Sequence, residues 1–260
     1  MKVKCVQMNV MFAKPEENFE NAEKLVRQAA VGGADCIVLP ETWNTGFFPR
    51  EGLEELADRF GERTKALFGG LAKELSVNIV AGSVANVKAD GVYNTAYVFD
   101  REGRCVAEYD KTHLFSPMDE DKYFKKGHHT AMFDLDGVKC GIIICYDVRF
   151  PELTRAMTVK GVDILFMVSQ WPEVRVAHLD ALTRARAIEN QMFMVCCNAS
   201  GTAGATVYGG NSSVTDPWGN VLVHAEGTGE EIISADCDTS ILDGIRSSIN
   251  VFRDRRSDMY

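Results

Sequence analysis

The chain has 260 residues, of which 46% are hydrophobic and 25% are charged, proportions typical of a folded globular protein. These values exclude intrinsic disorder, a collagen-like repeat and a small disulfide-stapled scaffold, since a chain of this length buries enough surface to form a core. Lys and Arg number 28 against 37 Asp and Glu, and the net charge of −9 argues against a nucleic-acid partner, which requires a basic face.

Strands and helices alternate along the first two thirds of the chain. A strand at 2–10 precedes a helix from Pro15 with an apolar stripe at spacings of three and four, and 35–40 form a short buried strand. The leucine-rich segment 53–75 predicts one long helix or two. Further strands are predicted at 77–82, 92–100, 104–110, 138–145 and 163–168, and helices from Pro151 and over 172–189.

The last third is rich in strands, predicted at 192–198, 207–216, 220–224 and 230–236. No Pro- or Ser-rich linker, charge block or internal repeat divides the chain. We therefore expect one domain over residues 1–260, in the α/β class, with mixed sheets covered by helices.

Membrane and metal signals are weak throughout. The longest apolar runs, such as 141–145 and 192–197, are far shorter than the roughly 18–20 residues that span a bilayer. Polar Gln7 and Asn9 interrupt the start of the chain, so we expect no signal peptide. The eight cysteines form no C-x-x-C pair and have no histidines at zinc spacing, which predicts free thiols in a reducing cytoplasm and no metal.

Cys145 lies between a buried strand, 138–144, and a helix start at Pro151. A helix N-terminus and nearby cations lower the pKa of a thiol, so Cys145 is a candidate nucleophile with a lowered pKa. The alternative is a core cysteine at the end of a strand.

Glu41 and Lys111 occupy similar positions, after the predicted strands 36–40 and 105–110. Taken alone, Glu41 could be a loop carboxylate and Lys111 a surface charge. Because open α/β sheets assemble their sites at the carboxyl ends of strands, we expect Glu41, Lys111 and Cys145 to meet. A thiol nucleophile, a carboxylate base and an ammonium for the oxyanion suffice for acyl transfer.

Three motifs around these residues resemble those of the nitrilase superfamily of carbon–nitrogen hydrolases. They are PETW at 40–43, DKTHL at 110–114 and CYDVRFPE at 145–152, in the family's order, and the resemblance covers the whole length. Later segments that resemble the ω-amidase branch are 184–191, 216–219 and 251–260. The resemblance implies a nitrilase-like α-β-β-α four-layer sandwich, with two mixed sheets and outer helices, that pairs into a homodimer.

The resemblance also implies a reaction. A ω-amidase cleaves the terminal amide of small 2-oxo dicarboxylic acid monoamides, 2-oxoglutaramate and 2-oxosuccinamate, to acid and ammonia through a thioester, with no metal or organic cofactor. Glu41 would exchange protons with Cys145 and the leaving ammonia, while Lys111 and the backbone N–H of Tyr146 would stabilise the oxyanion. The alternatives are an N-carbamoyl amine or amino-acid hydrolase, another aliphatic amidase, or a non-enzymatic nitrogen-related binding or scaffold protein.

The family has a second glutamate in the loop after the lysine motif. Glu120 is the candidate, with Asp119 and Asp121 as alternatives. For the substrate, we expect Trp171 to form a pocket wall and Arg175 to bind a carboxylate.

Other mechanisms make different demands on the sequence. A Cys–His hydrolase requires one of the five histidines beside the thiol: His113, His128, His129, His178 or His224. Residues 209–213 (GGNSS) hint at a serine amidase, but the lysine–serine pattern of that class is absent. Arg149 is interpreted as tying down the turn after Cys145.

Overall fold

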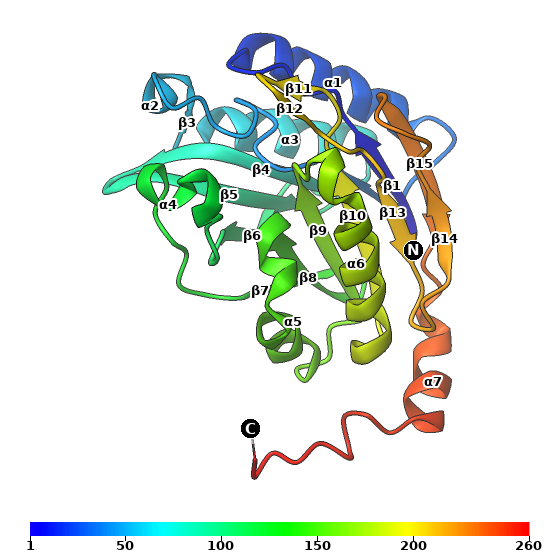
Figure 1. Ribbon diagram of the computed structural model, residues 1–260. Coiled ribbons are helices and arrows are strands. Elements are labelled where there is room, and N and C mark those ends of the chain that lie inside the picture. The colour runs from blue at the N-terminus through cyan, green and yellow to red at the C-terminus, as the bar shows by residue number, and fades with distance from the viewer. Residues whose placement is uncertain (260) are drawn as a thin grey trace.

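Two β-sheets lie face to face in the computed structural model, which describes residues 1–259 (Figure 1). The first sheet has the order β15-β1-β2-β4-β5-β6, and β3 pairs with β4. Its strands are β1 (Lys2–Gln7), β2 (Cys36–Val38), β3 (Asp58–Arg59), β4 (Asn78–Lys88), β5 (Gly91–Phe99), β6 (Cys105–Asp110) and β15 (Glu231–Asp236). β1, β2 and β4 are parallel, whereas β15, β5 and β6 are antiparallel to their neighbours, so the sheet is mixed.

The second sheet has the order β14-β13-β10-β9-β8-β7 and is also mixed. Its strands are β7 (Ala131–Leu135), β8 (Val138–Ile144), β9 (Ile164–Ser169), β10 (Phe193–Asn198), β13 (Ser213–Thr215) and β14 (Val221–His224). β8, β9 and β10 run parallel at its centre. A separate hairpin pairs β11 (Thr202–Ala203) with β12 (Thr206–Val207).

Helices cover the outer faces, which gives the predicted α/β sandwich of four layers (Figure 1). α1 and α3 cover the first sheet, and α5 and α6 cover the second. The helices are α1 (Pro15–Ala30), α2 (Leu53–Leu56), α3 (Glu62–Leu75), α4 (Glu120–Tyr123), α5 (Pro151–Thr158), α6 (Val176–Asn190) and α7 (Leu242–Ser248). None of the helices within 1–259 is long and apolar enough to cross a membrane.

The core follows from the alternation of side chains along each strand. In β2, Val38 faces the second sheet, where it belongs to the same apolar cluster as Phe166 of β9, whereas Ile37 faces the helices. The stripe of α1 packs against that outer face through Phe19 and Leu25. Each such fully buried side chain stabilises the fold by roughly 1.5–3 kcal/mol.

The predicted segments 53–75 and 207–216 are both divided by residues with positive φ. Residues 53–75 form two helices, the second alternative of the prediction, with the short β3 between α2 and α3, because Phe60 and Gly61 both adopt positive φ. The predicted strand 207–216 is interrupted because Gly210 and Asn211 have positive φ, at 56° and 57°. β7 was not predicted, although its side chains alternate strictly between buried and exposed positions.

Gly82 on β4 positions the chain that leads to Glu41. Its φ is +63°, and a Cβ atom there would lie 2.0 Å from the carbonyl oxygen of Pro40. The neighbouring amide of Ser83 donates to that same oxygen at 3.0 Å. Only glycine permits this approach, so the end of β2 is fixed against β4 just before Glu41.

Candidate active site

The three candidate catalytic residues each follow the end of a strand within three positions of the sequence, as predicted: Glu41, Lys111 and Cys145. Lys111 directly follows β6, Cys145 directly follows β8, and Glu41 follows β2 after Leu39 and Pro40. β2 and β6 belong to the first sheet and β8 to the second, so the three residues approach one another where the ends of both sheets meet. Glu41 and Lys111 are fully buried, whereas Cys145 is partly exposed and lines a pocket.

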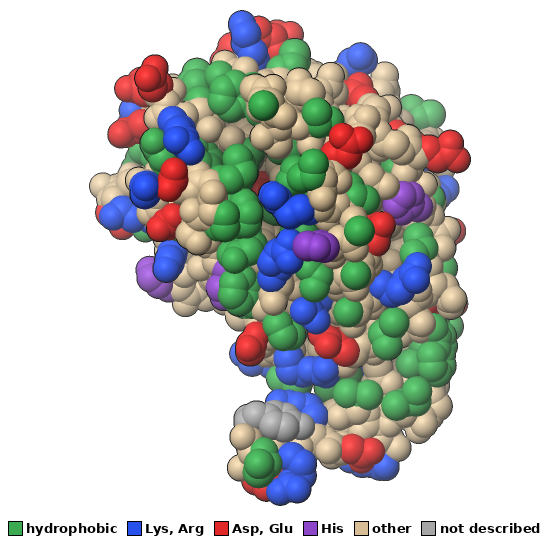
Figure 2. Space-filling model, viewed as in Figure 1, with side chains coloured by type: hydrophobic (Ala, Val, Ile, Leu, Met, Phe, Trp, Pro, Cys, Tyr) green, Lys and Arg blue, Asp and Glu red, His purple; other side chains and the backbone are tan. Residues whose placement is uncertain are grey.

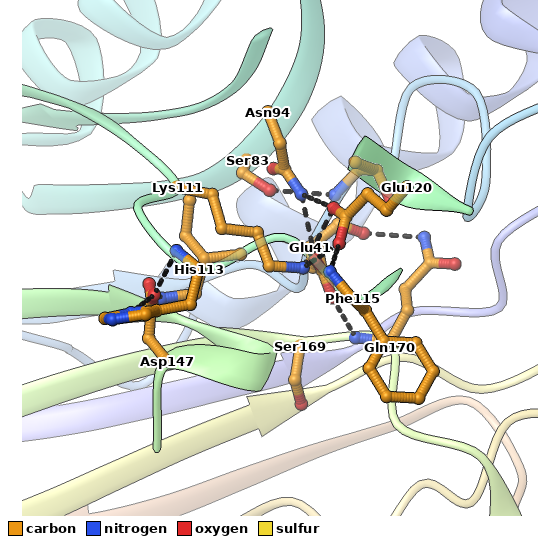
Figure 3. A network of polar contacts seen from close by, with 12 residues as sticks. Glu41, Ser83, Asn94, Lys111, His113, Phe115, Glu120, Asp147, Ser169 and Gln170 are labelled. Atoms are coloured by element: carbon orange, nitrogen blue, oxygen red, sulfur yellow. Dashed lines mark hydrogen bonds and ion pairs between the residues drawn. The ribbon is translucent and has the colours of Figure 1, made fainter. Parts of the chain in front are cut away.

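The Lys111 ammonium lies between two buried carboxylates (Figure 3). Its Nζ is 2.8 Å from Glu41 Oε1 and 2.9 Å and 3.0 Å from the two oxygens of Glu120. The structure thus brings Glu120 to the lysine. Asp119 instead pairs with Arg50 and Lys122 near the surface, and Asp121 is exposed.

These contacts keep Lys111 charged. Burial alone lowers the pKa of an ammonium, but the charges of Glu120, Glu41 and Cys145 outweigh it and raise the pKa of Lys111. Burial also raises the pKa of Glu120, a shift that Lys111 opposes and Glu41 reinforces. Removing one member of such a buried set leaves uncompensated charge, which typically costs about 3–5 kcal/mol.

The surroundings of Cys145 differ from the prediction. Burial and the charge of Glu41 raise the pKa of its thiol, and Lys111 only partly offsets them. The expected lowering by a helix N-terminus is therefore wrong. The chain after Cys145 forms a 3₁₀ turn, Cys145–Arg149, and α5 begins only at Pro151. Cys145 itself has a φ of +45°, a left-handed conformation that is strained for a non-glycine residue.

Asp147, which the sequence analysis missed, connects the turn of Cys145 to the segment of Lys111. Its buried carboxylate accepts hydrogen bonds from the backbone N–H of Ile144 at 2.9 Å and of His113 at 3.0 Å. The Tyr109 hydroxyl donates to it at 2.8 Å and the Thr112 hydroxyl at 3.1 Å. Asp147 therefore fixes the strained turn against the end of β6.

Asn94 and Gln170 were also missed, and both contact Glu41 (Figure 3). The Asn94 amide nitrogen donates to Glu41 Oε1 at 2.8 Å, and the backbone N–H of Gln170 donates to Oε2 at 2.8 Å. Asn94 could have been found, because it is a polar residue inside the apolar strand 92–99. Gln170 also donates from its side-chain amide to the backbone carbonyl of Glu41 at 2.6 Å. It gave no such signal, because it follows the predicted strand 163–168 as one polar residue among several.

A pocket opens beside Cys145 and contains every predicted substrate-binding residue. Its lining residues are Phe47, Phe115, Met118, Cys145, Tyr146, Arg149, Gln170, Trp171, Pro172, Arg175, Thr206 and Tyr208. The guanidinium carbon of Arg175 lies 5.3 Å from the centre of the Phe115 ring, and that of Arg149 lies 4.7 Å from the Trp171 ring. Basic side chains gather between α4 and α6 near the middle of the face in Figure 2, next to apolar ones.

Arg149 lines this pocket, and its Nη2 lies 3.4 Å from Nδ1 of His178 on α6. Arg186 of α6 also holds the turn after Cys145, because its Nε donates to the carbonyl of Val148 at 2.9 Å. The role of Arg149 in fixing the turn stays a prediction. The pocket carries two guanidinium groups, from Arg149 and Arg175.

The rival mechanisms find little support in these contacts. The charged groups that shift the pKa of Cys145 are Glu41, Lys111 and Glu120, and no histidine is among them. Ser212 uses its hydroxyl in hydrogen bonds with the backbone of Asn198. Within residues 1–259, no group of three or more His, Cys, Asp or Glu side chains is arranged to hold a metal ion.

Comparison with known proteins decides the family. The family described as "Carbon-nitrogen hydrolase" matches residues 2–246. The chain belongs to this family, within the nitrilase superfamily. The hydrolase is 44% identical to "2-oxoglutaramate amidase" of Bacillus subtilis (strain 168), over 99% of this chain and 98% of that protein. It is 34% identical to the human "Omega-amidase NIT2", over 100% of this chain and 96% of that protein.

A solved structure agrees with the sequence relationship. The crystal structure of XC1258 from Xanthomonas campestris, described as a CN-hydrolase superfamily protein, matches with a TM-score of 0.91 at 28% identity, covering 99% of this chain and 97% of that chain. The sandwich of two mixed sheets and outer helices is therefore the fold of this superfamily, as predicted. The protein is an enzyme, an amidase of the carbon–nitrogen hydrolase family.

Glu41→Gln tests the electrostatics of the thiol in this hydrolase. After burial, the charge and the hydrogen bond of Glu41 are causes that raise the pKa of Cys145, and glutamine removes the charge. The pKa of the thiol then falls, so more thiolate is present at a fixed pH near 7. We expect iodoacetamide to alkylate Cys145 about tenfold faster, the ratio for one pKa unit.

The measurement is the alkylation rate at Cys145 by mass spectrometry between pH 6.5 and 9. Asp121→Asn is the matched control, because it removes an exposed carboxylate from the loop that carries Glu120. Slower alkylation of Glu41→Gln than of the wild type contradicts this account of the thiol.

Proposed function

We propose that this amidase hydrolyses the terminal amide of small 2-oxo dicarboxylic acid monoamides, such as 2-oxoglutaramate and 2-oxosuccinamate, to the acid and ammonia. The observation that carries the proposal is a pocket lined by Cys145 and two arginines, with the buried Glu41–Lys111–Glu120 set beside the thiol. The thiol and the buried set suit acyl transfer, and the two arginines suit an anionic substrate. The resemblance to 2-oxoglutaramate amidase, with almost complete coverage of both chains, supports the same substrate class.

The first step is attack of the Cys145 sulfur on the amide carbon. Because the pKa of the thiol is raised, Cys145 rests as a neutral thiol and must lose its proton as the C–S bond forms. The Glu41 carboxylate is a hydrogen-bond partner of this thiol and accepts its proton. A base placed in this way contributes typically 10²–10⁴-fold to the rate.

The second requirement is stabilisation of the oxyanion formed on the amide oxygen. Lys111 keeps its proton because its pKa is raised by Glu120 and Glu41, so it presents a permanent positive charge. The backbone N–H of Tyr146, the residue after the nucleophile, is the second donor. Loss of one such donor commonly costs about 3–4 kcal/mol of transition-state stabilisation.

Collapse of this intermediate breaks the C–N bond and leaves a thioester on Cys145. Glu41 returns its proton to the departing nitrogen, so that ammonia leaves. Glu41 then takes a proton from water, whose oxygen attacks the thioester, and the acid is released with the thiol restored. Glu120 remains on Lys111 throughout and holds the ammonium in place.

The distal end of the substrate lies against the apolar and cationic wall of the pocket. Trp171 is 2% exposed and its ring nitrogen donates to the Arg175 carbonyl at 2.7 Å, so this wall is rigid. Arg175 binds the carboxylate next to the 2-oxo group, assisted by Arg149. Charge-assisted bonds of this kind favour substrates with a terminal carboxylate over neutral amides.

We also propose that the enzyme forms a homodimer and works in a reducing cytoplasm. Ile188, Trp218 and Ile249 line one groove and remain 46%, 52% and 51% exposed. Apolar side chains gather near the lower end of β14 and α7 in Figure 2. Exposed apolar surface of this kind is typical of interfaces. In a two-fold symmetric dimer, the same surface of a second copy of the chain covers it. All eight cysteines are free thiols, which suits a reducing compartment.

Ile188→Asp tests the dimer, because it places a charge in the centre of that groove. We expect the wild type to sediment as a dimer at micromolar concentration and the variant as a monomer. Val31→Asp changes another exposed apolar residue, at the end of α1, and should remain dimeric. A monomeric wild type in sedimentation velocity overturns this part of the proposal.

Ammonia release from 2-oxoglutaramate tests the substrate and the nucleophile together. We expect turnover by the wild type and a fall of at least about 10⁴-fold in Cys145→Ala, which has no atom to form the thioester. An N-carbamoyl amine and butyramide are assayed in parallel. Faster turnover of the N-carbamoyl amine than of 2-oxoglutaramate would assign the enzyme to the N-carbamoyl hydrolases. Faster turnover of butyramide would assign it to other aliphatic amidases. Undiminished turnover by Cys145→Ala contradicts the thioester mechanism.

Arg175→Ala tests recognition of the carboxylate. Loss of a charge-assisted hydrogen bond costs about 1.5–3 kcal/mol, so we expect KM for 2-oxoglutaramate to rise about 10–100-fold. KM for butyramide, which has no carboxylate, should change little. Arg184→Ala, an exposed arginine of α6 outside this pocket, is the matched control. Equal changes in KM for both substrates rule out a role for Arg175 in binding the carboxylate.

A further inference from the structure

Asn94 contacts three members of the site at once, yet the mechanism above gives it no part. It lies on β5 and is fully buried. Its Nδ2 atom is 2.8 Å from Glu41 Oε1 and 3.3 Å from Glu120 Oε1 (Figure 3). Its backbone oxygen accepts the N–H of Lys111 at 2.9 Å. Asn94 is therefore fixed to the segment of Lys111 and faces both carboxylates.

The chemistry of the amide group makes this position informative. An amide nitrogen carries two hydrogens, so Nδ2 can donate one to Glu41 and one to Glu120. With both carboxylates ionised, Lys111 supplies one positive charge against two negative charges. Asn94 is a second donor shared by the two glutamates, and it adds no charge.

We propose that Asn94 is a positioning residue for the hydrolysis, whose amide nitrogen bridges Glu41 and Glu120 and keeps Glu41 as the carboxylate that receives the thiol proton. The proposal rests on the role of Glu41 in the proposed function. A hydrogen bond that a carboxylate accepts favours its ionised form, and the bridge supplies one such bond to each of the two glutamates.

The other groups around Glu41 cannot replace this contact. Lys111 already donates to Oε1, and the backbone N–H of Gln170 occupies Oε2. Cys145 faces Glu41 with a proton that it can donate, and Glu120 faces Glu41 with a negative charge. The phenol of Tyr208 is also near, and the charge of Glu41 raises the pKa of that phenol beyond the effect of burial. Without Asn94, Glu41 Oε1 keeps a single donor.

Asn94→Ala tests the proposal through the pH dependence of kcat/KM for 2-oxoglutaramate, or for whichever amide the wild type hydrolyses best. Loss of a donor to a carboxylate makes its protonation easier, so more of the enzyme is inactive at low pH. We expect the acid limb of the profile to move up by about one pH unit. At a pH below the midpoint of the acid limb of the wild type, kcat should fall about tenfold while KM changes little.

Asn86→Ala is the matched control, because Asn86 is an equally buried amide on the neighbouring strand β4. Its Nδ2 also makes two hydrogen bonds, to Thr95 Oγ1 at 3.1 Å and Tyr97 Oη at 2.8 Å. In both asparagines, Oδ1 has no hydrogen-bond partner among the described residues. Both variants should lose similar thermal stability, and only Asn94→Ala should move the acid limb.

Asn94→Ser retains one hydroxyl donor and should move the limb by less than Asn94→Ala; it carries the test if the alanine variant does not fold. An acid limb in Asn94→Ala and Asn94→Ser equal to that of the wild type overturns the proposal, as does an equal shift in Asn86→Ala. Glu41→Gln separates this failure from failure of the proposed function. If Glu41→Gln retains normal turnover, Glu41 is not the base and the mechanism itself fails.

Discussion

One ammonium group between two carboxylates determines the arrangement of the rest of this enzyme. Lys111, Glu41 and Glu120 are all fully buried, and such charges are tolerated inside a protein only when they are paired and hydrogen-bonded. Their partners come from strand ends in both sheets, with Asn94 on β5 and Gln170 after β9. The sandwich must therefore hold these ends in register, and its apolar core between the sheets provides that rigidity.

The backbone around this set is held in conformations that the sequence disfavours locally. Thr42, which follows Glu41, and Cys145 have φ values of +36° and +45°. Strain of this kind costs of order 1–3 kcal/mol for each residue and persists only where the surroundings enforce it. Gly82 enforces it near Thr42 by its contact with Pro40. Asp147 enforces it at Cys145 by accepting hydrogen bonds from the backbone of Ile144, the preceding residue, and of His113 in the segment of Lys111. The strain orients the thiol and the carboxylate before substrate binds.

The sequence predicted the parts of the site that have a local signature. Glu41, Lys111 and Cys145 each follow a predicted strand, and the residues next to each of them suffice to reveal this position. Asn94, Asp147 and Gln170 have partners 53, 34 and 129 residues away, and such contacts are visible only in the folded chain. The raised pKa of Cys145 was missed for the same reason, since it depends on burial and on a distant glutamate. Periodicity predicted mixed sheets covered by helices, and the family resemblance implied their four layers. The place of the break in 53–75 depended on positive φ at Phe60 and Gly61.

The charge of the buried set explains why the resting nucleophile can be a neutral thiol. In the proposed mechanism, Cys145 is protonated, Glu41 and Glu120 are ionised and Lys111 is charged, so the four groups carry a net charge of −1. Transfer of the thiol proton to Glu41 leaves this net charge unchanged. The oxyanion that forms next keeps the same total, as does the thioester after ammonia takes the proton from Glu41. No step therefore moves a new charge into the site, where the low dielectric constant makes the desolvation free energy of a charge largest. A thiolate that had lost its proton to solvent before the substrate arrived would lose this balance, because the set would then carry one more negative charge.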